Sequence, residues 1–295
     1  MKRNTWILVA VLALLVVVTI LVLNRHGEQS TEGLMEAPLV SYDSAAVDRI
    51  EITSAADSVV LARQGSRWMV EAPVTAPADE SVVGSAIGKG ASIRLKSLVS
   101  SNPEKQALFQ VDSTATLVRI FDHGTERAAF RIGKMGSSYR DTYVRREGSN
   151  DVYLADGVLT YVFNKPVRDW RDRSIFRTDQ NAIQEVDFHY GDTTFTLLRE
   201  DSLWTVNGAA ANDNTVRSFL TSLSSFQADA FVDSAVALGN PEAQIQVGTT
   251  TLSFFRTGAD KLTVRSSASA QLYEIYNWRA NQLLKRERDF IATPA

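Results

Sequence analysis

Two segments of the chain, 136 positions apart, repeat one pattern of alternating apolar residues that leads to a tryptophan. Residues 47–73 and 183–209 align without a gap, so that Trp68 matches Trp204. A chance register would not align both the alternation and the tryptophan. Alternation is typical of strands with one buried face, and repetition of the whole pattern predicts two copies of one structural unit.

A predicted helix follows the tryptophan segment in each copy. After a two-residue slip, ADESV at residues 78–82 aligns with NDNTV at residues 212–216. Asp79 and Asp213 stand where an N-cap or first-turn acid belongs. The apolar residues that could share a helical face are Val82, Val83, Ala86 and Ile87 in the first copy, and Val216, Phe219, Leu220 and Leu223 in the second.

The remainder of each copy differs in length but keeps its order. An Asn-Pro-Glu turn at residues 102–104 recurs at residues 240–242, and hairpin-like alternation follows each turn. Both copies then close on Arg-Asp-aromatic, at residues 168–170 and 288–290, with an offset of 120. One unit is therefore predicted to be a strand meander, a helix, a turn, about four further strands and a short closing helix.

This plan predicts an α+β fold with two tandem strand-rich repeats. Each repeat is expected to be an antiparallel sheet whose packed face is covered by helices. We place the first α+β repeat at residues 40–178 and the second at residues 179–295, with the boundary near residues 177–181.

An apolar run near the N-terminus adds a second constraint. Residues 6–23 are eighteen residues in which Thr19 is the only polar member. At 1.5 Å per residue, a helix of this length spans about 27 Å, close to the hydrocarbon thickness of about 30 Å. The run therefore predicts an N-terminal transmembrane helix within an anchor at residues 1–26.

The flanking charges predict the orientation of that helix. Lys2 and Arg3 precede it and only Arg25 follows it closely, which favours a cytoplasmic N-terminus and an extracytoplasmic domain at the inner membrane. A cleaved signal peptide is the alternative, although residues 24–26 (NRH) are a poor cleavage site. Residues 27–39 are polar and weakly patterned, and are expected to form a flexible tether.

Charge and cysteine content exclude several classes of function. The chain has 31 basic and 34 acidic residues, and without the three bases beside the apolar run the balance is 28 against 34. Such a surplus of acid repels phosphate backbones, so no nucleic-acid partner is expected. Because the chain contains no cysteine, disulfides, thiolate metal sites and cysteine nucleophiles are excluded.

No residue pattern indicates catalysis, a metal or a cofactor. The three histidines have no metal-ligand spacing, and the scattered carboxylates fit solvated strand faces. The glycines of residues 84–90 (GSAIGKG) lack phosphate-loop spacing, and we interpret them as a weak helix end. We therefore predict a protein that is not an enzyme, while a hydrolase with dispersed Ser, Asp and Arg residues stays an alternative.

The densest charge run, residues 168–173, is the main candidate for a contact surface. Such alternation usually forms a solvated helical face, but Arg and Trp are also the side chains that most often anchor interfaces. Trp68 and Trp204 hold matching places, which favours core packing over a carbohydrate platform. The candidate partner contacts are accordingly Trp170, Arg171, Arg173 and Trp278.

These features together resemble a known family. The membrane helix, the duplicated strand–turn–W-x-V segments and the closing phrase RDRSIF at residues 171–176 are similar to a bacterial domain-of-unknown-function family of membrane-anchored proteins associated with gliding-motility-type ABC transporters. The resemblance covers nearly the whole chain beyond the anchor. It implies a cell-envelope protein whose partners are an ABC-type permease, its ATPase and an auxiliary envelope subunit.

The sequence thus leads to a principal hypothesis and, besides the hydrolase, an alternative from a further class. The principal hypothesis is a non-enzymatic, membrane-anchored, extracytoplasmic accessory or scaffold subunit of an ABC-type transport system. The alternative is an envelope binding module that holds a glycan or peptide ligand in a groove between the repeats.

Overall fold

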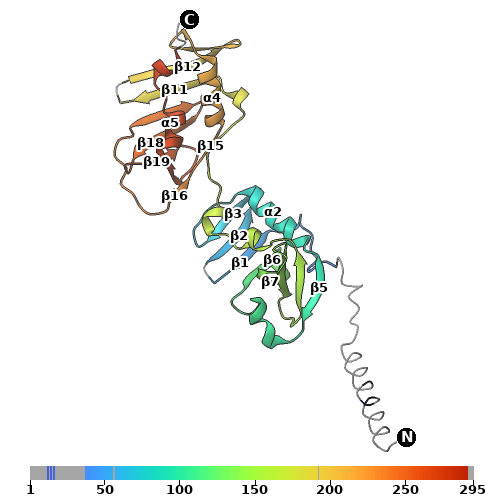
Figure 1. The fold of residues 1–295 in the computed structure, drawn as a ribbon. Helices are drawn as coiled ribbons and strands as arrows, with labels where there is room; N and C mark the ends of the chain where they lie inside the picture. Colours follow the sequence, from blue (N-terminus) through green and yellow to red (C-terminus); the bar gives the residue numbers. More distant parts are fainter. Residues whose placement is uncertain are drawn as a thin grey trace, which may run out of the picture. The chain divides into compact units, whose positions relative to one another are not determined.

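Each copy of the duplicated sequence builds one large antiparallel sheet in the computed structural model (Figure 1). The structure describes Leu12, Leu14, Val16 and residues 37–55, 57–191 and 193–291. The chain divides into two compact units, which we call the first and second units. The first comprises residues up to 73 together with 81–167, and the second comprises 74–80 together with residues from 168 onward.

The first sheet has nine strands in the order β4-β3-β2-β1-β6-β7-β8-β9-β5. Its strands are β1 (Arg49–Thr53), β2 (Ser58–Gln64), β3 (Arg67–Ala72), β4 (Ala76–Pro77), β5 (Leu95–Ser100), β6 (Thr116–Asp122), β7 (Thr125–Met135), β8 (Asp141–Arg146) and β9 (Val152–Asp156). The helices along this stretch are α2 (Glu80–Ala91) and α3 (Thr160–Phe163), with 3-10 turns η2 (Pro103–Lys105), η3 (Ala107–Phe109) and η4 (Val167–Trp170).

The second sheet repeats the same order, as β14-β13-β12-β11-β17-β18-β19-β20-β16. Its strands are β11 (Glu185–Tyr190), β12 (Thr193–Glu200), β13 (Leu203–Val206), β14 (Ala209–Ala210), β16 (Ala230–Val232), β17 (Ala243–Val247), β18 (Thr250–Arg256), β19 (Lys261–Ser266) and β20 (Leu272–Tyr276). The accompanying elements are η5 (Gln180–Ala182), α4 (Asp213–Ser224), α5 (Asn277–Leu283), α6 (Glu287–Phe290) and the β10 (Ser174–Arg177)–β15 (Ser225–Gln227) pair.

Matching sequence positions take matching structural roles in the two sheets. The turn after β2 has a positive φ at Gly65, and the equivalent turn after β12 has one at Asp201. Glycine adopts this left-handed conformation freely, and aspartate is among the few other residues that tolerate it. The offset of 136 therefore reflects a shared hairpin geometry as well as shared apolar positions.

The closing turns also match. The backbone N–H of Asp79 donates to the carbonyl of Trp170 at 2.8 Å, and that of Asn212 donates to the carbonyl of Phe290 at 2.7 Å. Both aromatic side chains are fully buried. Each copy thus ends with an aromatic residue whose backbone meets the start of its long helix.

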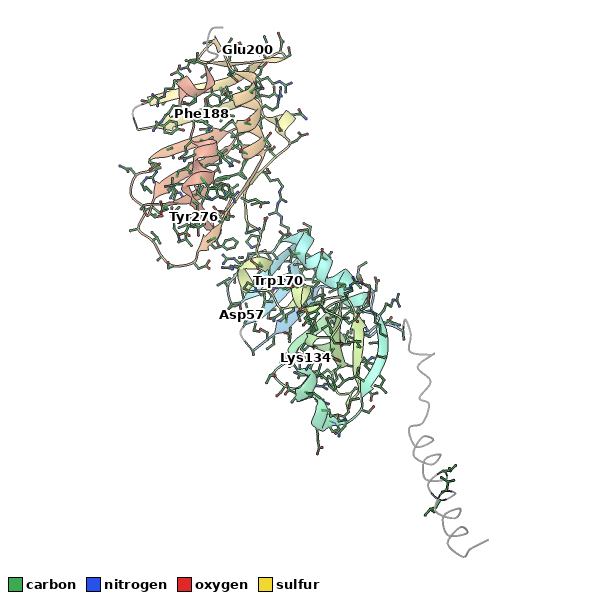
Figure 2. The ribbon with its side chains drawn as sticks, in the orientation of Figure 1. Asp57, Lys134, Trp170, Phe188, Glu200 and Tyr276 are labelled. Atoms are coloured by element: carbon green, nitrogen blue, oxygen red, sulfur yellow. The ribbon has the colours of Figure 1, made fainter. Side chains whose placement is uncertain are left out.

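The second unit has a core rich in aromatic rings. Phe188, labelled in Figure 2, is fully buried and stacks on Phe195 at 4.4 Å between ring centroids. Phe219 of α4 and Phe290 of α6 lie 5.3 and 5.7 Å from the same ring. All four apolar residues predicted to share the face of α4 are buried, so that prediction is confirmed. In α2, Val82 is only half-buried, whereas the other three predicted residues are buried.

The structure corrects the predicted fold class. The protein is mostly β and is built on large antiparallel sheets, whereas we predicted an α+β class. The predicted closing helices are the short turns η4 and α6. Within the described part of the chain, the longest helix beside each sheet is α2 or α4, with 12 residues each. The helical share was overestimated because short apolar runs of helical period do not reveal how soon a helix ends.

The predicted N-terminal transmembrane helix is contradicted as well. Among the residues that the structure describes, no helix is both long and apolar enough to cross a membrane. The apolar run at residues 6–23 lies outside the described residues except for Leu12, Leu14 and Val16, and the predicted tether at 27–39 is described only from residue 37.

The two compact units meet at residue 168. The second unit takes up the chain at Arg168 and also includes residues 74–80. Backbone hydrogen bonds explain why these segments belong together, because the N–H of Asp172 donates to the carbonyl of Pro77 at 2.9 Å. An isolated bridge between Ala78 and Arg171 adds to the pairing.

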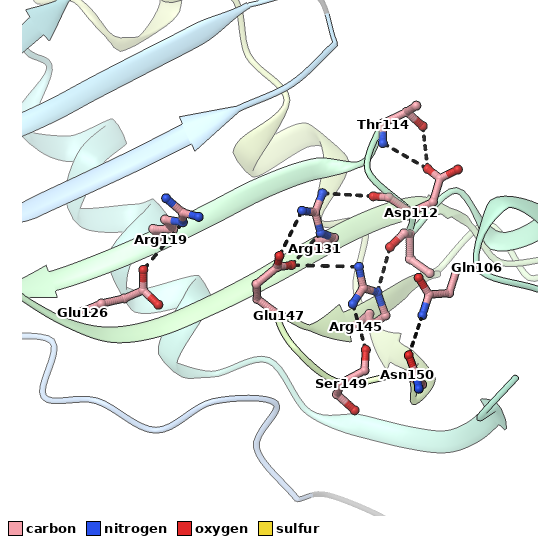
Figure 3. A network of polar contacts seen from close by, with 11 residues as sticks. Gln106, Asp112, Thr114, Arg119, Glu126, Arg131, Arg145, Glu147, Ser149 and Asn150 are labelled. Carbon is pink, nitrogen blue, oxygen red and sulfur yellow. Dashed lines mark hydrogen bonds and ion pairs between the residues drawn. The ribbon is translucent and has the colours of Figure 1, made fainter. Parts of the chain in front are cut away.

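A charged network supports the first sheet along β7 and β8 (Figure 3). Arg131 donates from Nε and Nη2 to the two carboxylate oxygens of Glu147, at 2.6 and 3.1 Å. Arg145 is buried and donates to the carbonyls of Val111 and Ser149. Glu147 therefore neutralises two guanidinium groups that the fold holds close together.

This network predicts a pH-dependent contribution to stability. Hydrogen bonds from Arg131, with added attraction from Arg145, hold the pKa of Glu147 below its ordinary value. A depressed folded pKa gives stabilisation that is complete above the unfolded pKa of about 4.3 and is lost as the pH falls through the folded pKa. Glu147→Gln is therefore expected to lower the free energy of unfolding at pH 7. It is also expected to reduce the loss of stability that the wild type shows below pH 5. Urea unfolding of the full chain at several pH values measures both effects.

Glu126→Gln is the matched control, since Glu126 meets Arg119 only at 3.6 Å on the same sheet. This account of the network would be contradicted if the wild type and the Glu147→Gln variant lost the same amount of stability below pH 5.

Candidate functional site

A charged pocket of about 430 Å³ lies in the second unit, and we call it the arginine pocket. Two chain segments form it, residues 168–173 and residues 229–233. They run side by side because β10 pairs with β15 and the N–H of Ala228 donates to the carbonyl of Arg173 at 2.8 Å. The residues that line it are Arg168, Asp169, Arg171, Arg173, Asp229, Ala230, Phe231 and Asp233.

Arg171 is the buried centre of this pocket, with 4% of its surface exposed. Its Nη1 and Nη2 donate to the two carboxylate oxygens of Asp233, each at 2.8 Å, in a bidentate pair. Nη2 also donates to Oε1 of Gln271 at 2.7 Å, and the guanidinium lies 3.7 Å from the ring centroid of Phe231. The planar fork, which pairs with both carboxylate oxygens at once, is a geometry that arginine provides and lysine does not.

Two properties of the ion pair between Arg171 and Asp233 matter for binding: the charge of Asp233 and a donor of Arg171 without a partner. The hydrogen bonds from Arg171 lower the pKa of Asp233, so the carboxylate stays ionised well below neutral pH. The Nε atom of Arg171 is buried and has no hydrogen-bond partner among the described residues. A buried donor without an acceptor is costly, which sets this atom apart from the other donors of Arg171.

Asp229 forms the second anchored carboxylate. Arg279 of α5 donates to both its oxygens, the shortest contact being 2.7 Å, and the backbone N–H of Tyr276 donates to it at 3.0 Å. Burial by itself would raise the pKa of Asp229, but these hydrogen bonds outweigh it and lower the pKa. The guanidinium of Arg279 also lies 4.5 Å from the ring centroid of Trp278, which is 54% exposed.

Arg168 and Arg173 are the exposed cations of the pocket. Arg168 approaches Asp169 at 3.7 Å, a weak contact between neighbours on the surface. The side chain of Arg173 makes no hydrogen bond and no ion pair with any described residue. It is close enough to Asp229 to help lower the pKa of that carboxyl. Its guanidinium is therefore available to a partner molecule.

The structure separates the four predicted contact residues into two groups. Arg173 and Trp278 are exposed, and Asp229 with Arg279 connects them. Arg171 lines the same pocket but is buried in its ion pair. Trp170, which we named as a candidate partner contact, has a fully buried side chain, so it does not form part of an exposed surface.

Sequence reasoning missed Asp229, Phe231 and Asp233, which complete the pocket. The contact between Arg171 and Asp233 joins residues 62 positions apart, and no local spacing announces it. The sequence did indicate that Trp170 is buried. The offset of 120 pairs Trp170 with Phe290, and an apolar aromatic residue at the equivalent position favours a place in the core.

Within the described ranges, no group of three or more His, Asp or Glu side chains is arranged to hold a metal ion. The chemistry that the arginine pocket offers is recognition of charge, through arginines with donors in a fixed fork and one apolar ring.

Comparison with known proteins gives a family match. The family described as "Domain of unknown function (DUF4340)" matches residues 68–244, which include every residue that lines the arginine pocket. The curated proteins and the solved structures give no match.

Proposed function

We propose that this chain, which belongs to the DUF4340 family of domains of unknown function, is a non-enzymatic accessory or scaffold subunit. The arginine pocket supports this proposal because its groups are suited to binding rather than to a named reaction. The partner of the chain is the permease of an ABC-type transport system, and the complex lies on the extracytoplasmic side of the cell envelope. The resemblance of the duplicated segments and of the closing phrase at residues 171–176 supports the link to ABC-type transport.

The observation that carries the proposal is a pair of exposed side chains: Arg173, which lines the arginine pocket, and Trp278, which contacts Arg279 next to it. Tryptophan and arginine are the residue types most enriched among the side chains that dominate binding energy. Trp278 is held by an anchored neighbour, since Arg279 pairs with Asp229 and contacts the ring of Trp278. A surface that is already ordered loses less conformational entropy on binding.

Photo-crosslinking in intact cells tests the proposal. We expect the full chain with benzoylphenylalanine in place of Trp278 to give one defined adduct, which mass spectrometry identifies as the permease. The matched control carries the same group in place of Tyr161, an exposed aromatic residue of the first unit (74% exposed). Adducts with many unrelated proteins, or equal permease capture from both positions, would overturn the proposal.

A further inference from the structure

We propose that the arginine pocket is a carboxylate-binding site, whose ligand is an acidic side chain or a C-terminal carboxylate presented by an extended peptide segment. This inference deepens the proposed function by naming the chemistry that the partner presents, and it rests on that function only for the source of the peptide. Four features of the pocket support it.

The first feature is the local charge. Three arginines and three aspartates line the pocket, and Arg279 outside the lining already neutralises Asp229. Three guanidinium groups therefore match three carboxylates in the lining, in a chain whose overall formal charge is −3. The pocket lacks the acidic surplus of the protein as a whole, so it repels an anion less than the rest of the surface does.

The second feature is the availability of donors. Arg173 is exposed and its guanidinium has no hydrogen-bond or ion-pair partner within the part of the chain that the structure describes. Arg171 is buried, and its Nε donor has no acceptor among the residues that the structure describes. An incoming carboxylate would gain charge-assisted hydrogen bonds, which are stronger than neutral ones.

The third feature is an internal template. Asp233 shows that Arg171 accepts a carboxylate in the bidentate geometry, with both contacts at 2.8 Å. The Asp233 side chain is 48% exposed and stands where β16 ends and an irregular segment, residues 233–242, begins. Asp233 therefore occupies part of the site in the free protein and competes with an external carboxylate.

The fourth feature favours a carboxylate on an apolar stem over a free phosphate. The ring of Phe231 and the methyl group of Ala230 supply an apolar wall for the stem that carries the carboxylate.

The test is a titration of the full chain followed by the Nε–H NMR signals of its arginines. The probe is the capped tripeptide acetyl-Asp-Asp-Asp-amide, and acetyl-Asn-Asn-Asn-amide and inorganic phosphate are the comparison probes. We expect a saturable shift of the Arg171 Nε–H signal with the aspartate peptide, a much weaker response to phosphate, and none with the asparagine peptide.

Three variants separate a site from general charge attraction. Arg173→Gln is expected to weaken peptide binding about tenfold, as loss of one charge-assisted contact does. Arg217→Gln, on the exposed side of α4 in the same unit, is expected to leave it unchanged. Asp233→Asn removes the internal competitor and is expected to tighten peptide binding.

Equal affinities for the wild type and the Arg173→Gln variant would overturn the proposal, and so would phosphate binding at least as tight as that of the aspartate peptide. The outcome is distinct from that of the crosslinking experiment. Permease capture without carboxylate binding would reject only the ligand chemistry, whereas carboxylate binding without permease capture would reject only the proposed partner.

Discussion

Replacement of Phe188 by alanine is expected to destabilise the second unit more than any other single truncation considered in this protein, by about 3–5 kcal/mol. The ring is fully buried and contacts three other aromatic side chains, Phe195, Phe219 and Phe290. These come from β12, α4 and α6, so the substitution opens a cavity where sheet and helices meet. Neighbouring rings are rigid and fill such a cavity poorly, which raises the cost.

Hydrogen exchange followed by mass spectrometry measures this effect unit by unit. Peptides from β11, β12 and α4 are expected to lose protection in the Phe188→Ala variant, while peptides from β1 and β2 keep the wild-type rate. Leu203→Ala is the control, because Leu203 lies in the same unit but is 64% exposed and its truncation should cost less than about 0.5 kcal/mol. Equal loss of protection in both units would contradict this description of the core.

Replacement of Arg171 by methionine is expected to cost about 2–4 kcal/mol of the stability of the second unit. The substitution keeps most of the apolar contact with Phe231 but leaves Asp233 and Gln271 without their donor. Removing one partner of a buried ion pair typically costs about 3–5 kcal/mol. We expect the lower part of that range or slightly less, since the Asp233 side chain is 48% exposed and regains hydration.

A double-mutant cycle with Asp233→Asn isolates the pair. The double variant should be less destabilised than the sum of the two single variants, because either substitution alone breaks the same interaction. Arg256→Met provides the control, since Arg256 forms a bidentate pair with Glu242 on the surface, where such pairs contribute up to about 1 kcal/mol. Additive effects of Arg171→Met and Asp233→Asn would show that the two side chains are not energetically coupled.

The sequence was informative wherever structure is encoded by local periodicity. The alternation around Trp68 and Trp204 predicted matching hairpins, and those tryptophans lie at matching places in β3 and β13. Trp68 is buried and Trp204 packs partly buried against the core of its unit, as expected of core residues. Strand and helix faces are readable in this way because burial repeats with the period of the element.

Other features escaped prediction because they depend on contacts between distant segments. The start of the second unit at Arg168 follows from pairing with residues 74–80, and no local pattern encodes that pairing. The class was misjudged because a closing segment of helical period turned out to be a single turn. Trp170 was misjudged because its charged neighbours suggested a surface, although its repeat equivalent, Phe290, indicated the core.

In the arginine pocket, too, the sequence revealed the local charge run but not the contacts between distant segments. Residues 168–173 were recognisable as an unusual charge run, and Arg171 and Arg173 do line one pocket. The carboxylates that define its chemistry come from residues 229–233, which carry no motif of their own. Only the fold could show that Arg171 is buried and paired while Arg173 is exposed and available.

One measurement tests most directly whether this surface binds the partner. In intact cells, benzoylphenylalanine at position 278 is expected to form an adduct with the permease, and the yield of that adduct is compared between two variants in which an arginine is replaced by glutamate. Arg173→Glu adds a negative charge to the pocket and should abolish the adduct, whereas Arg217→Glu makes the same change on α4, away from the pocket, and should leave the yield intact. An undiminished adduct in the Arg173→Glu background, with the protein folded and present at the wild-type level, would contradict the account.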